Sequence, residues 1–384
     1  MPARKSIDRS VLIAAIAFEK SLGKTQKQIS EALGISQSEV SRMLTPAQDI
    51  GWIGAPSFKI VDQDTWKQAE DQFYSTAALC KALRRQFDEP GERLHRISWL
   101  HTGQGGRIDA GSVGIFQTLL SEAGSVGVTW GRTISRVADA LGQLLVNRPG
   151  RDRSNRIIFV PLCGEPLAGG DPSSHSSSVL ALRLTQIFNA GDLEALSIAG
   201  VPAFIPLKVG RLEEIAPIRH LISLVRGHEK IFGVPDGSGG DVPPLVDNLD
   251  AILTSVGRVD PVRRGIFLTE RTQVGDISEA QLMRSVAGDI GGVIIPNSGI
   301  EPDDARRITE MNSNWTGAHD EHLRRCADAA HRAGFIRKRP GVILLALGAN
   351  RVKVVLRCVD LGLVNELVID KELADALMAH LRIG

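Results

Sequence analysis

From about residue 95 onwards, the chain alternates short β-branched or apolar runs with amphipathic segments. This alternation is typical of βα units, in which helices cover a largely parallel sheet. We therefore predict an α/β fold for most of the chain. The predicted strands cover residues 96–101, 125–130, 156–162, 250–255, 292–296, 341–347 and 367–370.

Length and composition narrow the class of protein. With 384 residues, of which 43% are hydrophobic, the chain can form two or three domains with real cores. A wholly disordered, collagen-like or coiled-coil chain is excluded. The 45 basic and 44 acidic residues give a net charge of +1. This balance rules out a uniformly basic nucleic-acid coat, but it leaves room for a small DNA-binding segment.

The four cysteines lie far apart, and no two have the C-x-x-C spacing of a metal or redox site. We interpret them as apolar core residues in a reducing cytosol. No apolar stretch approaches the roughly 18 residues of a membrane-spanning helix, and the first ten residues lack a signal-peptide core. We therefore expect a cytoplasmic protein with no membrane association, no metal and no cofactor.

Two helix starts can be identified near the N-terminus, within the sequence TQKQISEALGISQSEVSRML of residues 25–44. Thr25 followed by Gln28, and Ser36 followed by Glu39, have the spacing of capping boxes. In a capping box the hydroxyl and the longer side chain each satisfy a free backbone N–H at a helix start. The spacing predicts two short helices.

Between these helix starts lies Gly34, which suits a tight turn that needs positive φ. In the second helix Val40, Met43 and Leu44 recur at i, i+3 and i+4, so they form one inward apolar stripe. The polar residues that alternate with them point outward. This pattern predicts a helix-turn-helix whose second helix enters the major groove of DNA.

The outward residues have the chemistry that reads base pairs, because arginine can bind guanine and glutamine can bind adenine. Residues 1–50 contain seven basic and five acidic residues, a net charge of only +2. Affinity per module should be weak, so we expect a dimer or larger homo-oligomer on double-stranded operator DNA. The predicted DNA-binding residues are Thr25, Gln26, Ser36, Gln37, Ser38, Ser41 and Arg42.

A second informative stretch is GVTWGRTISRVADAL, residues 127–141, where an apolar strand meets Gly131 and a new helix. Such a turn places free backbone N–H groups and the positive end of a helix dipole where an anion can bind. Thr129, Arg132 and Thr133 add two hydroxyls and a cation, which suits a phosphate or a sugar acid. The next predicted strand ends in a glycine-rich loop over residues 161–178, which is where open α/β sheets usually bind ligands.

The order of these features resembles that of the SorC-type family of sugar-responsive transcriptional regulators. The resemblance begins with the helix-turn-helix and covers almost the whole chain. It continues through GVTWGRT at 127–133, PLCG at 161–164, DAILTSVG at 250–257, GDIGG at 288–292 and the stretch from 347 to 377.

The resemblance implies a bacterial regulator with an N-terminal helix-turn-helix domain and a Rossmann-like effector domain, similar in fold to sugar-phosphate isomerases and deaminases but without catalysis. It also implies a sugar or sugar-phosphate effector and an assembly of two or four copies. Where the family commonly carries a lysine, this chain has Arg351, which can grip phosphate but cannot form a Schiff base. The implied effector-binding residues are Thr129, Gly131, Arg132, Thr133, Gly164, Glu165, Asp289 and Arg351.

We accordingly expect a helix-turn-helix domain at 1–57, a helical linker or oligomerisation segment at 58–90 and an effector domain at 91–384. Two other readings stay open. One is a sugar-phosphate isomerase or deaminase with a helical appendage, which would need a carboxylate or histidine placed as a base. The other is a helix-turn-helix that binds protein and never DNA.

Overall fold

The structure is a computed structural model of the 384-residue chain. It describes residues 8–21, 24–50, 52–54, 57–58, 75–103, 107–108, 112–120, 123–146, 156–167, 175–189, 195–210, 213–225, 227–233, 243–260, 266–333 and 339–382.

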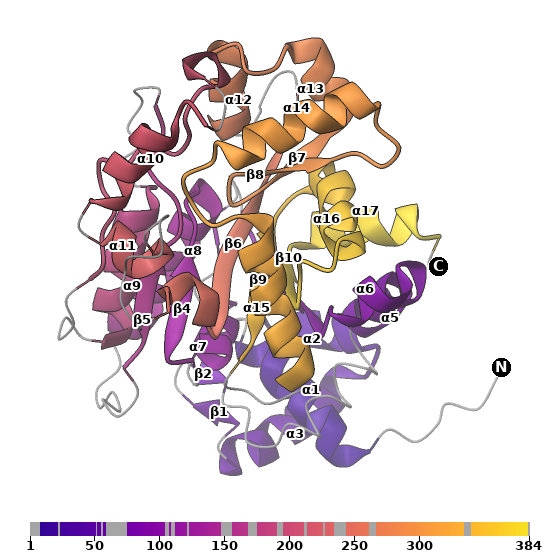
Figure 1. The fold of residues 1–384 in the computed structure, drawn as a ribbon. Helices are drawn as coiled ribbons and strands as arrows, with labels where there is room; N and C mark the ends of the chain where they lie inside the picture. The colour runs from indigo at the N-terminus through magenta and orange to yellow at the C-terminus, as the bar shows by residue number, and fades with distance from the viewer. Residues whose placement is uncertain are drawn as a thin grey trace.

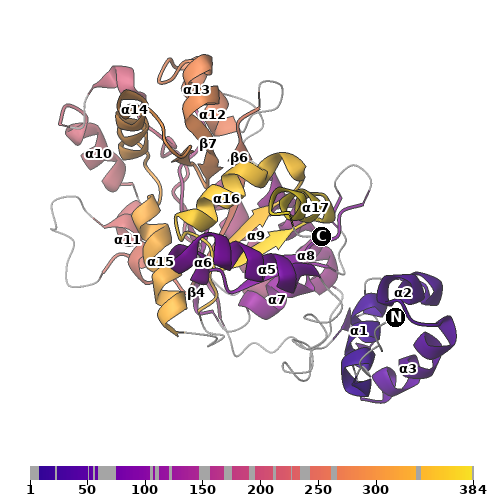
Figure 2. The same ribbon diagram turned by 90° about the vertical axis from the view of Figure 1, so that its right-hand side faces the viewer.

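Three helices and a short hairpin form the N-terminal part: α1 (Arg9–Ser21), α2 (Gln26–Leu33), α3 (Gln37–Asp49), β1 (Ile53–Gly54) and β2 (Ser57–Phe58). The helices share a small core of their own, in which Ile16, Ile29 and Val40 are fully buried. Figure 2 shows them grouped beside the larger α/β part. The predicted helix-turn-helix is therefore present in the fold.

Six strands form a parallel sheet in the order β3-β10-β9-β6-β4-β5. Because non-consecutive strands are neighbours, the connections cross over the sheet, as they must between parallel strands. Figure 1 shows the helices packed around it. The six strands are β3 (Arg96–Trp99), β4 (Ser125–Val128), β5 (Ile158–Pro161), β6 (Ala251–Arg258), β9 (Gly341–Ala346) and β10 (Glu366–Ile369).

Both faces of this sheet are buried, and side chains alternate between two core clusters. Ile252 belongs to one cluster and Leu253 to the other, as the two-residue period of a strand requires. One face is covered by α7 (Gly114–Leu120), α8 (Arg132–Val146) and α9 (Ser177–Asn189). The other is covered by α5 (Ser75–Gln86), α15 (Asp320–Ala333), α16 (Val352–Asp360) and α17 (Lys371–His380).

An antiparallel hairpin, β7 (Val286–Ile290) and β8 (Val293–Pro296), extends from the end of β6. The sequence predicted β8 but not β7, whose pairing depends on the distant end of β6. The hairpin lies in the upper part of Figure 1 with α12 (Ile266–Gln273), α13 (Glu279–Ser285) and α14 (Pro302–Ser313). The remaining described helices are α6 (Asp88–Glu92), α10 (Ala216–Ser223), α11 (His228–Phe232) and the 3-10 turns η2 (Leu207–Val209), η3 (Leu245–Asn248) and η4 (Ala349–Arg351).

The predicted linker at 58–90 contains α5 and the start of α6. Leu79 and Leu83 of α5 are buried in the same core cluster as the sheet, and α5 packs against β3 and α17. Residues 59–74 lie outside the described residues. The domain limits at 57 and 90, and an oligomerisation role for this segment, stay predictions.

Candidate functional site

The helix-turn-helix begins with the cap that the sequence predicts. The Thr25 hydroxyl accepts a hydrogen bond from the Gln28 N–H at 3.3 Å, and the Thr25 N–H donates to Gln28 Oε1 at 2.9 Å. At the start of α3, Ser36 Oγ accepts from the Glu39 N–H at 3.2 Å, which forms one half of the second capping box. Gly34 adopts the left-handed conformation at φ 63°, as the turn requires.

These contacts decide which face of α3 is free. Val40 is buried against α1 and α2, and Met43 and Leu44 pack beside it half-buried. The predicted DNA-binding residues Thr25, Ser36, Gln37, Ser38, Ser41 and Arg42 are exposed, and Gln26 is half-buried. The start of α3 therefore presents hydroxyl, amide and guanidinium groups to solvent, which is the arrangement that a recognition helix needs. Their contact with DNA stays a prediction.

The second candidate site lies where the sheet order reverses. From β4 the chain continues outward to β5, whereas from β6 it continues in the opposite direction through β9 to β10. Ligands of open α/β sheets bind outside the carboxyl ends of the strands at such a switch point. The residues that directly follow β4 are the predicted Thr129, Gly131, Arg132 and Thr133. We call this region, between the carboxyl ends of β4 and β6, the switch-point site.

Thr129 forms the base of the switch-point site. It is buried, and its hydroxyl lies 3.0 Å from that of Thr254 in β6. Gly131 has φ +136°, and a side chain there would approach Ser255 Oγ at 3.0 Å. Glycine is thus needed for the backbone conformation, and a side chain there would also press on Ser255. Thr254 and Ser255 were missed in the sequence, although they belong to the quoted 250–257 stretch.

Helix α8 starts at this point, with Arg132 and Thr133 as its first residues. The first amides of a helix have no partner within it, and its dipole favours an anion there. Thr133 is half-buried and Arg132 is exposed. This geometry is consistent with the predicted anion-binding helix start, and contact with a ligand stays a prediction.

Three arginines at this end of the sheet influence one another through their charges. Burial lowers the pKa of Arg351, and the positive charges of Arg258 and Arg132 lower it further. The acidic residues Asp370 and Glu372 act in the opposite direction. Arg258 ends β6 and was not singled out in the sequence, where only its position directly after the 250–257 stretch gave a signal. We call Arg132, Arg258 and Arg351 the arginine cluster.

Asp289 packs over the end of β6, two residues before the turn that contacts Thr129. It lies on β7, is buried, and accepts a hydrogen bond from the Gly292 N–H at 3.2 Å. Burial raises its pKa to about 7. Its carboxyl group lies over Gly257, where any side chain would collide with it. In the turn that follows, a side chain on Gly291 would come within 2.6 Å of Thr129 Cγ2. Asp289 therefore shapes the floor through packing as well as through charge.

Gly164 and Glu165 lie at the end of β5, towards the edge of the site. Gly164 is buried, and a side chain there would collide with the carbonyl of Val201. Glu165 is half-buried; burial raises its pKa, and a hydrogen bond with Ser176 acts against that rise. The neighbouring His175 carbonyl accepts from the Gly131 N–H at 3.1 Å. This hydrogen bond connects the turn at Gly131 to the segment of His175 and Ser176, which contacts Glu165. Gly164 has a packing role.

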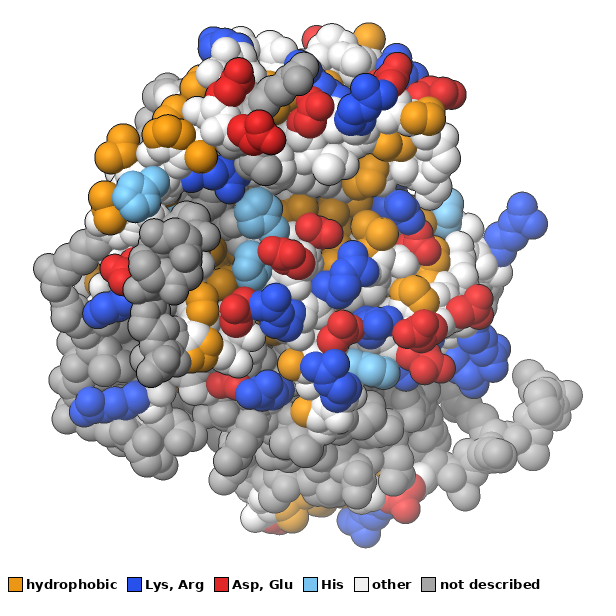
Figure 3. Space-filling model, viewed as in Figure 1, with side chains coloured by type: hydrophobic (Ala, Val, Ile, Leu, Met, Phe, Trp, Pro, Cys, Tyr) orange, Lys and Arg blue, Asp and Glu red, His pale blue; other side chains and the backbone are white. Residues whose placement is uncertain are grey.

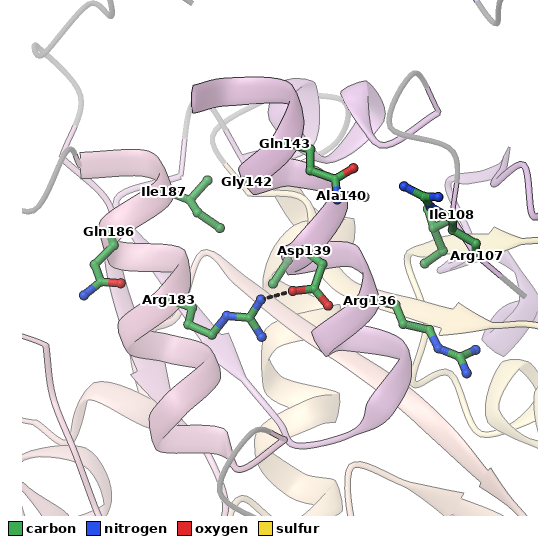
Figure 4. A pocket seen from close by; sticks show the side chains of 11 residues that line it. Arg107, Ile108, Arg136, Asp139, Ala140, Gly142, Gln143, Arg183, Gln186 and Ile187 are labelled. Carbon is green, nitrogen blue, oxygen red and sulfur yellow. Dashed lines mark hydrogen bonds and ion pairs between the residues drawn. The ribbon is translucent and has the colours of Figure 1, made fainter. Parts of the chain in front are cut away.

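A separate groove of about 740 Å³ runs between α8 and α9 (Figure 4). Arg107, Arg136 and Arg183 line it, and Arg183 is paired with Asp139 (Figure 4). None of the predicted effector-binding residues lines this groove. It is therefore distinct from the switch-point site.

The described residues also bear on DNA binding, metal binding and membrane crossing, through their surface charge, ligand groups and helix length. Among the coloured, described side chains of the face in Figure 3, acidic and basic groups are interspersed and form no broad basic surface. Within the described ranges, no group of three or more histidine, cysteine or acidic side chains is placed to hold a metal ion. No helix in the part of the chain that the structure describes is long and apolar enough to cross a bilayer.

Comparisons with known proteins agree with the sequence resemblance. No protein-family model matches the chain. It is 26% identical over 191 residues to the sorbitol operon regulator of Klebsiella pneumoniae, a match that covers 48% of this chain and 54% of that protein. The chain thus spans about half the length of the curated relative that it matches.

Two solved structures show the shared fold. The full-length sorbitol operon regulator SorC of Klebsiella pneumoniae superimposes with a TM-score of 0.52 at 21% identity, over 97% of this chain and 100% of that one. A sugar-binding domain of a transcriptional repressor from Vibrio fischeri gives 0.50 at 17% identity, over 80% and 100%. The predicted SorC-type resemblance and fold class are confirmed.

Proposed function

We propose that the chain is a DNA-binding transcriptional regulator whose operator affinity changes when a sugar, polyol or phosphorylated sugar binds at the switch-point site. The observation that carries this proposal is the start of α8 after the carboxyl end of β4, at the switch point of the sheet. The positive charges of Arg132 and Arg258 act on Arg351 there, and an anion bound near them offsets the repulsion. Asp260, 3.9 Å from Arg258, offsets it only at that arginine. Among the three ligand classes, the cluster therefore favours a phosphorylated one.

The proposed ligand has two parts. Its phosphate binds Arg132, Arg258 and Arg351 and the free amides of α8. Its hydroxyls hydrogen-bond to Thr133 and, at the edge of the site, to Glu165. Thr129 and Asp289 support the floor from below, since both are buried and already have partners within the chain.

The DNA-binding part rests on the exposed start of α3. Arg42, Gln37 and Ser38 are free to reach base edges, and Thr25 and Ser36 lie at helix starts, where phosphates bind. The modest charge of this part makes one copy a weak binder, so we propose a homodimer or homotetramer that engages two half-sites. Regulation requires the ligand to bind the DNA-competent and the incompetent arrangement with affinities that differ about 5- to 150-fold.

The rival function is an isomerase or deaminase. The relatives are regulators, and the geometry of Asp289 also favours binding over turnover. Its carboxyl is packed over Gly257 and hydrogen-bonded to the Gly292 N–H, which leaves it poorly placed to take a proton from a ligand. We propose that the switch-point site binds its ligand unchanged.

The test begins with selection of genomic DNA fragments by the purified full-length protein. Operator affinity is then measured by fluorescence anisotropy with sorbitol 6-phosphate, fructose 6-phosphate, their unphosphorylated forms and inorganic phosphate. We expect a phosphosugar, but not its unphosphorylated form, to change operator affinity at least fivefold. Absence of selected DNA, or turnover of a phosphosugar, would contradict the proposal.

Arg258→Ala tests the site itself. Loss of one charge-assisted contact, about 1.5–3 kcal/mol, should weaken phosphosugar binding at least tenfold. Operator affinity without ligand should be unchanged. Arg306→Ala is the matched control, because Arg306 is exposed on α14 and pairs only with its neighbour Asp303 among the described residues.

A further inference from the structure

Asp370 connects the loop that carries Arg351 to helix α17. It follows β10 directly, is buried, and its Oδ1 accepts two hydrogen bonds from separate segments. One comes from the Gly348 N–H at 2.9 Å and the other from the Leu373 N–H at 3.0 Å. The second bond is the N-cap of α17. A single carboxylate oxygen thus holds a ligand-site loop and a helix start together.

The loop itself is tightly tied to Arg351. The guanidinium donates to the Leu347 carbonyl and to Asn350 Oδ1, the latter at 3.2 Å. The Arg351 N–H donates to the Gly348 carbonyl at 3.2 Å. Gly348 has φ +91°, a conformation that glycine accepts readily. A ligand that drew the Arg351 side chain towards itself would break the bond to the Leu347 carbonyl, which belongs to the same peptide as the Gly348 N–H bound to Asp370.

Helix α17 connects this loop to another part of the effector core. It packs against η4, which contains Arg351, and also against α5. The buried Leu373, Ala374 and Leu377 of α17 belong to the same core cluster as Leu79 and Leu83 of α5. Helix α5 is the first described element after the hairpin that closes the N-terminal part. Helix α17 therefore packs against both the Arg351 turn and α5.

We propose that Asp370 is a positioning residue that couples the Arg351 loop to α17 and α5, so that ligand binding at this loop changes operator affinity. This inference rests on the proposed function, since it describes how the switch-point site regulates operator affinity. Asp370 does not touch the ligand. It acts by making the Gly348 peptide and the start of α17 move as one unit, because both are bonded to the same oxygen.

Three substitutions separate this role from simple stabilisation. Asp370→Ser keeps an excellent N-cap for α17, but its hydroxyl is too short to hold the Gly348 N–H as well. Asp370→Asn keeps an oxygen that can accept from both amides. Asp375→Ala removes a carboxylate from the exposed face of the same helix, where it pairs with Lys371, and serves as the matched control.

The readout is the ratio of operator dissociation constants with and without sorbitol 6-phosphate or fructose 6-phosphate. We expect Asp370→Ser to reduce this ratio to less than twofold while phosphosugar affinity in the absence of DNA changes less than threefold. Asp370→Asn and Asp375→Ala should keep at least half of the wild-type ratio. A wild-type ratio in Asp370→Ser, or full loss in Asp370→Asn, would overturn the inference.

A second measurement needs no ligand. In hydrogen–deuterium exchange on the full-length protein, Asp370→Ser should raise exchange at least threefold in peptides covering 347–352 and 75–86, relative to Asp375→Ala. Unchanged exchange over 75–86 would overturn the inference, whether or not the wild-type protein responds to a phosphosugar. Failure of the wild-type protein to bind operator DNA or phosphosugar would instead refute the proposed function.

Discussion

The buried carboxyl of Asp289 makes the stability of the effector part depend on pH in a way that Asp289→Asn should remove. Burial raises its pKa in the folded protein to about 7, from the ordinary value of 3.8 for an aspartate. Between these two values the folded state binds a proton that the unfolded state has already released. Stability is therefore highest below the lower pKa and falls as pH rises towards the upper one.

The size of this effect follows from the shift. Each pH unit between these two pKa values lowers the free energy of unfolding by about 1.4 kcal/mol. Between pH 5 and pH 8, about two pH units lie below the folded pKa of about 7. The free energy of unfolding of the wild type should therefore fall by about 3 kcal/mol relative to that of the variant. Asparagine is a close stand-in for the neutral carboxyl, because its amide oxygen can still accept from the Gly292 N–H.

The assay is urea unfolding followed by tryptophan fluorescence, since Trp130 and Trp315 pack in the core near the site. The free energy of unfolding is measured for wild type and Asp289→Asn at pH 5 and pH 8. Asp375→Asn, an exposed carboxylate on α17, reports the effect of losing a surface charge. A difference between wild type and Asp289→Asn that is equal at the two pH values would refute the reasoning.

Three further outcomes are expected. Arg42→Ala should weaken operator binding about 10- to 100-fold, which corresponds to the loss of one bidentate base contact. Lys20→Ala, which changes an exposed residue at the end of α1, should leave gel-shift selectivity intact, and equal effects would remove Arg42 from the interface. Thr133→Val should keep operator binding and blunt the phosphosugar response in the anisotropy assay, and a normal response would place the ligand elsewhere. Gly34→Ala should lower N-terminal stability by about 1–2 kcal/mol because of its φ of 63°, and unaltered thermal unfolding would contradict the turn geometry.

The DNA-binding element could be predicted from the sequence because everything that defines it is local. The Thr25 cap, the left-handed Gly34 and the inward Val40 depend on neighbours within about twenty residues, and the structure reproduces each of them. The alternation of apolar runs and amphipathic segments predicted the parallel strands for the same reason, since period and burial are recorded residue by residue.

The ligand site could be predicted only in part. The turn after β4 supplied Thr129, Gly131 and the start of α8, and the family resemblance supplied Asp289 and Arg351. Arg258 escaped notice because a single arginine after a strand resembles many others. Its significance depends on its charge acting on Arg351 together with that of Arg132, and this depends on the order of strands in the sheet.

The sequence alone therefore determined the fold class, the helix-turn-helix and the anion-suited turn, because these depend on short-range patterns. Tertiary structure decided that β7 pairs with β6, that Asp289 is buried over Gly257, and that Asp370 bonds to two segments at once. Each of these depends on parts of the chain that are distant in sequence. Burial and charge at such points are set by which neighbours the fold brings together, and no local pattern records that choice.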